Sequence, residues 1–239
     1  MKFYTACRKQ RTATTLEAHN LWKRLGGRVV LRAVQLELVE GEVVALTGAN
    51  GSGKTTLLRC LAGTTRVDRG EVKWFGQPLT HWKQKQWLGL VAHDSYLYSQ
   101  LTVRENLLFA ARMCGVRRPE QRVAHLLEEA GLADWSERLA GRLSRGMKQR
   151  LSVARAIVHQ PRILLLDEPF SGLDSVGCQW LAELLKRLQA DGCSICFVTH
   201  LWNYAQRLAD RILVLERGCL RQQSVSQPAQ QSKQNVRAA

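Results

Sequence analysis

Residues 48–55 read GANGSGKT, which fits the phosphate-binding pattern G-x-x-x-x-G-K-[ST] at every position. Glycines in such a loop let successive backbone N–H groups curl around phosphate oxygens, and the helix that follows points its positive end at the same anion. A β-rich run at 43–47 precedes the loop, and the apolar segment LLRCLAG follows it. These flanks argue against a glycine-rich turn that binds nothing, and they predict a site for nucleotide phosphates.

The loop supplies most of the candidate binding residues. Lys54 adds a point charge for the outer phosphates, Thr55 can bind Mg²⁺ through its hydroxyl, and Thr56 is placed for a further phosphate contact. The other candidates around the phosphates are Gly48, Asn50, Gly51, Ser52 and Gly53.

A second candidate group is the stretch at 163–168, where four apolar residues precede two carboxylates. A buried strand that ends in Asp167 places a Mg²⁺-binding carboxylate at the edge of a sheet beside the phosphate loop. Glu168, one residue further, would face attacking water as the general base or the water-positioning group. An apolar strand before an acidic turn is common, so the assignment depends on its pairing with the phosphate loop.

The segment LSRGMKQR at 143–150 is a third candidate. Ser144 and Gly146 lie at the start of a predicted helix, where a hydroxyl, free N–H groups and the helix dipole can all attract an anion. Taken alone, the segment favours the simpler interpretation, an ordinary helix N-cap.

The chain as a whole predicts an α/β protein with a mostly parallel sheet covered on both faces. Strands are expected at 36–47 with a turn at Glu40-Gly41, at 71–76 and at 88–92, followed by helices that start near Thr102 and Pro119. Strands at 163–166 and 194–199 then flank a helix. The expected organisation is a basic N-terminal extension at 1–18, one domain at 19–221 and a disordered polar tail at 222–239.

Composition and charge restrict the expected cellular location of the chain but do not identify its binding partner. The 239 residues carry a net charge of +15, which favours an anionic partner such as nucleic acid, a membrane surface or phosphate ligands. Apolar runs fall far short of the roughly 20 residues that cross a bilayer. Seven scattered cysteines and a basic start without an apolar segment favour a reduced, cytoplasmic setting. Cys193 and Cys196 form C-x-x-C, but their offset within a predicted strand points them to opposite faces, as expected of small buried residues.

The order of five motifs resembles the ATP-binding subunit of ABC transporters over about residues 20 to 220. The motifs are the phosphate loop, LSRGM at 143–147, ILLLDEP at 163–169, SGLD at 171–174 and TH at 199–200. The resemblance implies the P-loop NTPase fold of ABC ATPases, with a mostly parallel core sheet, an antiparallel N-terminal β part and a helical lobe at about 95–150. It implies ATP and Mg²⁺ as ligands and ATP hydrolysis as the activity.

The resemblance also assigns roles across a head-to-tail homodimer. Ser144 and Gly146 would complete the partner's ATP site, and Asp174 would join the two sites. His200 would touch the γ-phosphate and hold the catalytic geometry, although an isolated histidine after a strand is more often a turn residue. The implied catalytic set is Lys54, Glu168 and His200.

Four residues depart from the family pattern. His93 stands where many members have glutamine, and it is a candidate sensor that could bind Mg²⁺ through a neutral imidazole or a water. Leu25 stands where an aromatic ring stacks on adenine, which should weaken base discrimination unless Trp22 compensates. Arg145 and Met147 replace glycine and glutamine, and we expect altered affinity with the trans contact kept.

Three less specific features of the sequence resemble the haem exporter ATPase of cytochrome c maturation, the CcmA family. They are GEVKWFGQPL at 70–79, His93 and LTVRENL at 101–107. This resemblance implies a separate membrane-embedded permease chain and a cytoplasmic location on the inner face of the cell membrane. The alternatives are an exporter ATPase for another cargo and an ABC-type ATPase that acts on nucleic acid or ribosomes. The chain lacks a second cassette, zinc-binding cysteine clusters and a long coiled-coil insertion, so no specific nucleic-acid binding is expected. LSRGM and His200 together disfavour a P-loop kinase or GTPase.

Overall fold

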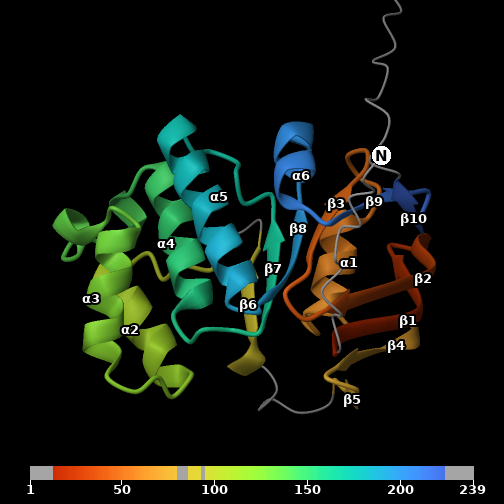
Figure 1. The fold of residues 1–239 in the computed structure, drawn as a ribbon, viewed down its shortest axis with the longest axis horizontal. Coiled ribbons are helices and arrows are strands. Elements are labelled where there is room, and N and C mark those ends of the chain that lie inside the picture. Colours follow the sequence, from red (N-terminus) through yellow and green to blue (C-terminus); the bar gives the residue numbers. More distant parts are fainter. Residues whose placement is uncertain (1–12, 80–85, 93–94, 224–239) are drawn as a thin grey trace, which may run out of the picture.

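The computed structural model describes residues 13–79, 86–92 and 95–223, arranged as two sheets and a set of helices (Figure 1). The larger sheet has the strand order β10-β9-β3-β8-β7-β6 and is parallel except for the β9–β10 pair. Its strands are β3 (Val43–Thr47), β6 (Leu88–Val91), β7 (Ile163–Asp167), β8 (Ser194–Val198), β9 (Arg211–Glu216) and β10 (Cys219–Gln223). The smaller sheet is antiparallel, with the order β2-β1-β4-β5. Its strands are β1 (Thr14–Leu25), β2 (Arg28–Val39), β4 (Arg69–Trp74) and β5 (Gln77–Pro78).

Helices cover the larger sheet on both faces. They are α1 (Lys54–Leu61), α2 (Val103–Met113), α3 (Pro119–Glu129), α4 (Arg145–Ile157), α5 (Ser175–Ala190) and α6 (Trp202–Leu208). Figure 1 shows α2 to α5 on one side of the parallel strands, and α1 with the antiparallel sheet on the other. In the described ranges, no helix combines the length and the apolar character that crossing a bilayer requires.

The central strands are apolar on both faces because each face contacts its own core. Every residue of β3, β7 and β8 is buried. Alternate residues belong to different clusters: Ile195 and Phe197 pack with the helices α4 to α6, whereas Cys196 and Val198 pack with α1 and the antiparallel sheet. This two-sided burial explains why these strands read as continuous apolar runs, and it confirms the predicted parallel sheet covered on both faces.

The helical lobe begins as its sequence predicts. Thr102 caps α2, its Oγ1 accepting from the Glu105 N–H at 3.1 Å while Glu105 Oε2 accepts from the Thr102 N–H at 2.7 Å. Pro119 starts α3. The buried amide of Asn106 bonds the backbone of Tyr98, Leu101 and Thr102, which fixes the segment before α2.

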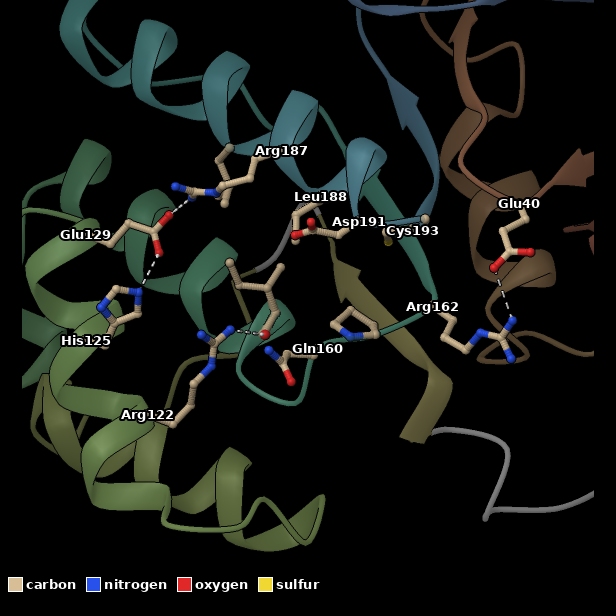
Figure 2. Close-up of a pocket in the computed structure, with 14 residues that line it drawn as sticks. Glu40, Arg122, His125, Glu129, Gln160, Arg162, Arg187, Leu188, Asp191 and Cys193 are labelled. Carbon is tan, nitrogen blue, oxygen red and sulfur yellow. Dashed lines mark hydrogen bonds and ion pairs between the residues drawn. The ribbon is translucent and has the colours of Figure 1, made fainter. Parts of the chain in front are cut away.

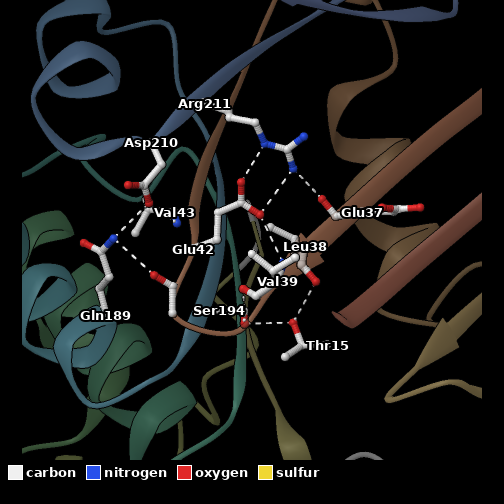
Figure 3. Close-up of polar contacts among 11 residues, drawn as sticks. Thr15, Glu37, Leu38, Val39, Glu42, Val43, Gln189, Ser194, Asp210 and Arg211 are labelled. Carbon is white, nitrogen blue, oxygen red and sulfur yellow. Dashed lines mark hydrogen bonds and ion pairs between the residues drawn. The ribbon is translucent and has the colours of Figure 1, made fainter. Parts of the chain in front are cut away.

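A buried charged network joins the two sheets at the edge where the parallel strands begin (Figure 3). Glu42 precedes β3 and accepts from Arg211 Nε at 2.6 Å and from the Val39 N–H at 3.0 Å. Arg211 also donates to the Glu37 carbonyl, and Ser194 of β8 bonds both Thr15 and the Val39 carbonyl. Because a buried carboxylate without partners is costly, this network holds β2 against β3, β8 and β9.

Four features of the fold differ from the sequence expectation. Strand β1 begins at Thr14, before the predicted boundary at 19, and β2 begins at Arg28. Strands β9 and β10 were not predicted, because their turn at Arg217-Gly218 has Arg where Asn or Asp usually precedes the glycine, although both positions have positive φ. Strand β10 continues to Gln223, so Gln222 lies in a strand and not in the expected tail. His93 and residues 224–239 lie outside the described residues.

Candidate functional site

The phosphate loop connects β3 to α1 at the carboxyl end of the parallel strands. Gly53 is the N-cap of α1 with φ +105, and a Cβ there would lie 2.7 Å from Val30 Cγ1, so only glycine fits under β2. The buried Lys54 ammonium donates to the carbonyls of Gly48 and Ala49 at 2.8 and 2.9 Å. The loop is therefore a compact turn with its lysine held at its centre, at the positive end of α1.

Two carboxylates lie at the carboxyl end of β7, which β8 separates from β3 in the sheet. Asp167 is the last residue of β7 and is 3% exposed, whereas Glu168 follows it with φ +49. A left-handed backbone at a residue other than glycine is strained, and such strain is retained where the geometry is needed. The Glu168 N–H donates to the Val198 carbonyl at 3.1 Å, which fixes the turn against β8.

His200 reaches Glu168 from the next strand. Its Nδ1 lies 2.9 Å from Glu168 Oε2. Because a carboxylate accepts, this contact assigns the proton to Nδ1 and leaves Nε2 free for another group. The His200 side chain is 62% exposed and the Glu168 side chain 19%, so the imidazole is open to a ligand while the carboxylate is sheltered.

A cleft of about 480 Å³ lies between the phosphate loop, the two carboxylates and the first hairpin. The predicted residues Gly48, Ser52 and His200 are not among those that line it. Most of the predicted phosphate and metal ligands line it, together with two aliphatic side chains from the antiparallel sheet, Leu25 and Val30. The predicted site residues in its wall are the ligands Asn50, Gly51, Gly53, Lys54, Thr55, Thr56 and Asp167, and the proposed base Glu168. Val30 was missed by sequence reasoning, because only the pairing of β2 with β1 brings it over the loop.

Mg²⁺ fits the polar end of this cleft. Asp167 Oδ2 is buried without a hydrogen-bond partner among the described residues, and Thr55 lines the same cleft. A carboxylate oxygen and a hydroxyl are hard oxygen ligands of the kind that Mg²⁺ prefers.

Ser144 and Gly146 do not line the cleft of their own chain. Ser144 is exposed and caps α4, where its Oγ accepts from the Met147 N–H at 3.3 Å, as an ordinary N-cap does. Ser144 and Gly146 therefore lie apart from the phosphate loop of the same chain.

The start of α4 is joined instead to the loop that follows Glu168. Arg145 Nη2 donates to Ser171 Oγ at 2.6 Å, and Gln149 Nε2 donates to the Pro169 carbonyl at 2.9 Å. Arg150 Nη2 lies 3.2 Å from Asp174 Oδ1, which also accepts from the Gly177 N–H at 2.8 Å as the N-cap of α5. The Gly177 N–H, more than Arg150, lowers the pKa of Asp174. These contacts were not predicted, because they depend on how α4 packs against the loop.

A second cavity, of about 430 Å³, lies at the opposite edge of the sheet between α3, α5 and the start of β7 (Figure 2). Its charges are paired within the chain: Glu129 contacts both Arg187 and His125, and Arg162 contacts Glu40. Arg122 donates to the last carbonyls of α4. Because most of these charges are paired within the chain and the phosphate loop lies at the other edge of the sheet, we interpret this cavity as a packing gap between α3, α5 and β7 and not as the nucleotide site.

The cysteine pair behaves as predicted. Cys193 and Cys196 are both buried, on opposite faces of the sheet, and burial raises the pKa of each thiol to about 12. Thiols that stay protonated are poor nucleophiles and metal ligands, which confirms the interpretation as core residues.

Comparison with known proteins agrees with this geometry. The family model described as ABC transporter matches residues 31–171. The SkfA peptide export ATP-binding protein SkfE of Bacillus subtilis (strain 168) is 36% identical over 209 residues, covering 87% of this chain and 87% of that protein. The sulfate/thiosulfate import ATP-binding protein CysA of Methylococcus capsulatus is 39% identical over 218 residues, covering 87% of this chain and 62% of that protein.

A solved structure gives the same fold. The dimeric, post-hydrolysis state of the ATP-binding cassette MJ0796 bound to ADP and Pi aligns with a TM-score of 0.81 and 28% identity, covering 89% of this chain and 99% of that one. Exporters and importers both occur among the relatives, so the family leaves the cargo open. The chain belongs to the ABC transporter family, as an ATP-binding subunit that hydrolyses ATP.

Proposed function

We propose that two copies of this chain bind ATP between them and drive a separate membrane-embedded permease. In each site, the phosphate loop of one copy faces Ser144 and Gly146 of the other. The observation that carries this proposal is the position of Ser144, exposed at the positive end of α4 but outside the cleft of its own chain. A hydroxyl and helix dipole so placed suit the phosphates held by a second copy. The dimeric cassette among the relatives supports the arrangement.

Within each site the residues divide the work of hydrolysis. Lys54 leaves its two carbonyl partners for the outer phosphates, where a charged partner gives a stronger hydrogen bond. Glu168 orients the attacking water and accepts its proton. His200, held through Nδ1 by Glu168, offers Nε2 to the γ-phosphate. Asp174 lies on the loop that is bonded to α4, which suits it to connect the two sites.

Thr55 and Asp167 would hold Mg²⁺ beside the phosphates. When bound, Mg²⁺ neutralises charge on the phosphate oxygens as the γ-phosphoryl group is transferred. The unpartnered Oδ2 of Asp167 supports this assignment.

The permease docks on an exposed apolar group of the helical lobe, at Tyr96, Tyr98, Phe109 and Met113. Their exposed fractions are 52%, 49%, 44% and 71%, and the rings of Tyr98 and Phe109 meet edge to face at 5.1 Å. Clustered apolar side chains at a surface suit a protein partner. Asn106 holds the backbone beneath Tyr98, which presents the group as a fixed surface.

We propose haem export in cytochrome c maturation as the cargo-level function, with the chain on the cytoplasmic face of the cell membrane. Only three sequence features support this assignment: residues 70–79, residues 101–107 and His93. The net charge of +15 suits an anionic membrane surface. An exporter for another cargo is the second candidate, because a peptide export protein is among the relatives.

Affinity purification of the tagged chain from membranes of its source organism tests the proposal. We expect a multi-span membrane protein to co-purify with the wild-type chain and with Lys186→Ala, a surface control on α5, but not with Phe109→Arg. Co-purification of ribosomes or nucleic acid in place of a membrane protein would contradict the proposal. Loss of covalently bound haem from c-type cytochromes in the Phe109→Arg strain tests the cargo separately.

A further inference from the structure

We infer that Tyr204 is a positioning residue for ATP hydrolysis, which stacks on Phe170 and so keeps His200 in contact with its carboxylate partner. The inference rests on the proposed function, in which Glu168 orients the attacking water and His200 contacts the γ-phosphate. Tyr204 is not among the residues that line the cleft. Its effect on the reaction is therefore exerted through the two side chains that it helps to hold together.

The two stacked rings lie on the two segments that carry the catalytic pair. Phe170 is two residues after Glu168, and Tyr204 is four residues after His200. The ring centroids of Phe170 and Tyr204 are 4.2 Å apart and their planes differ by 14°. Phe170 is buried and also meets the ring of Phe197 in β8 edge to face, with the centroids 6.2 Å apart. The stack therefore joins the turn after β7 to the helix after β8 and anchors both in the same core.

The helix that carries Tyr204 needs such a contact because it is short. α6 has seven residues, and its N-cap, Leu201, makes no side-chain cap hydrogen bond. A helix of this length is unstable in water on its own, so its position depends on packing against the rest of the protein. Its buried residues are Ala205 and Leu208, which lie further along the chain than Tyr204. The stack adds a contact of fixed geometry in the first turn of α6, close to His200.

The turn that carries Glu168 needs support as well. Glu168 has φ +49, and strain of this kind persists only where the surrounding structure holds it. The Glu168 N–H donates to the Val198 carbonyl, and its carbonyl accepts from the Ser171 N–H at 3.0 Å. Phe170 lies inside this turn and is 3% exposed, so its ring fixes the turn from the core side. Removal of the ring that stacks on Phe170 would loosen the turn and α6 together.

The contact between His200 and Glu168 is sensitive to such a change. The His200 side chain is 62% exposed, so packing of the imidazole itself does little to fix it. Its orientation follows from a backbone that leads directly into α6. Hydrogen bonds weaken steeply when they bend, and a misplacement of about 1 Å in a reacting group can cost about 10²-fold in rate. Tyr204 should therefore affect turnover and leave nucleotide affinity unchanged.

Steady-state ATP turnover of the purified full-length chain tests the inference. Tyr204→Leu removes the ring and should lower kcat about tenfold, with KM unchanged within about twofold. Tyr204→Phe keeps the ring and should retain at least about half of the wild-type kcat. Phe75→Leu is the matched control, because it removes one ring of the edge-to-face pair with Trp87, which precedes β6 at the opposite edge of the sheet. This control should leave kcat unchanged.

Combination with His200→Ala shows whether Tyr204 acts through the imidazole. The double variant should be no slower than His200→Ala alone, because the orientation that Tyr204 provides then has no imidazole to act on. A further tenfold loss in the double variant, or a normal kcat in Tyr204→Leu, would overturn the inference and leave the role of His200 intact. Undiminished turnover in His200→Ala would overturn the proposed function and the inference with it.

Nitrogen-15 NMR of the imidazole gives a readout that does not depend on turnover. At about pH 8, where imidazoles are neutral, the proton of His200 should reside on Nδ1 in the wild type and in Tyr204→Phe. His200→Ala identifies the signal. Tyr204→Leu should lose this preference, and an unchanged tautomer there would overturn the inference. Melting temperatures show that the variants are folded, and Tyr204→Met, which keeps apolar volume without a ring, should give the same result as Tyr204→Leu.

Discussion

His200 Nδ1 lies 2.9 Å from Glu168 Oε2 across two adjacent strands of the parallel sheet. Glu168 directly follows β7 and His200 lies two residues after Val198, the last residue of β8, so the sheet itself brings an acid and an imidazole together at its carboxyl edge. The strained backbone of Glu168 is retained at this point, and its N–H is bonded to β8. The pair gives the proposed site a base and an orienting group on one rigid support.

Glu168→Gln removes the base but keeps the size of the side chain. We expect ATP binding to remain and turnover to fall by about 10²- to 10⁴-fold, the usual contribution of a positioned base. The bound dimer should then accumulate with ATP. Light scattering with and without ATP measures the dimer, and phosphate release measures turnover. Undiminished turnover would remove Glu168 from its proposed role.

His200→Ala should lower turnover by about 10²-fold while nucleotide affinity changes little, because the imidazole orients groups at the γ-phosphate and makes few ground-state contacts. His125→Ala is the control, since His125 is an exposed residue of α3 at the opposite edge of the sheet. Steady-state kinetics on both variants separate kcat from KM. A rise in KM with unchanged kcat would show that His200 serves binding and not catalysis.

Lys54→Ala should abolish turnover and weaken ATP binding, because the outer phosphates lose their buried cation. Lys186→Ala, an exposed lysine of α5, should leave both unchanged. Nucleotide titration and phosphate release on the two variants check this. Equal activity of Lys54→Ala and the wild type would place the phosphates elsewhere.

The buried thiols of Cys193 and Cys196 predict a loss of stability at high pH. Burial raises the pKa of Cys196 from 9.0 to about 12, so the unfolded chain loses a proton that the folded chain keeps. The stabilisation is present below about pH 9 and is lost as pH rises towards about 12, by about 1.4 kcal/mol per pH unit for each thiol. Urea unfolding at several pH values measures it. Cys196→Val should reduce the slope and Cys219→Ser, at an exposed site, should not. The same slope in Cys196→Val as in the wild type would contradict the assignment.

Local patterns in the sequence predicted the parallel strands β3, β6, β7 and β8, the phosphate loop and the carboxylate turn, but not the parallel strand β9. GANGSGKT predicts the phosphate loop on its own, because the loop needs glycine. The apolar run before Asp167 likewise predicts a strand, because a strand buried on both faces needs continuous apolar residues. The capping box at Thr102 is equally local.

Contacts made by packing between distant elements were not predictable in this way. Val30 reaches Gly53 only because β2 crosses the phosphate loop, and Arg145 reaches Ser171 only because α4 lies beside the loop after β7. The positive φ of Glu168 and the hairpin at Arg217-Gly218 likewise depend on neighbours and not on residue type. Tertiary packing determines these four features, and all of them except the hairpin belong to the proposed site or the loop beside it.

The central claim is that each ATP site is shared between two copies, and mixing two inactive variants tests it most directly. Ser144→Asp keeps an N-cap for α4 but places a negative charge against the partner's phosphates, whereas Lys54→Ala disables the phosphate loop. A mixed dimer contains one site with an intact Lys54 facing an intact Ser144. We predict that each variant alone is inactive and that the mixture recovers part of the wild-type ATP turnover. If crosslinking shows that mixed dimers form and turnover still stays absent, the shared site is contradicted.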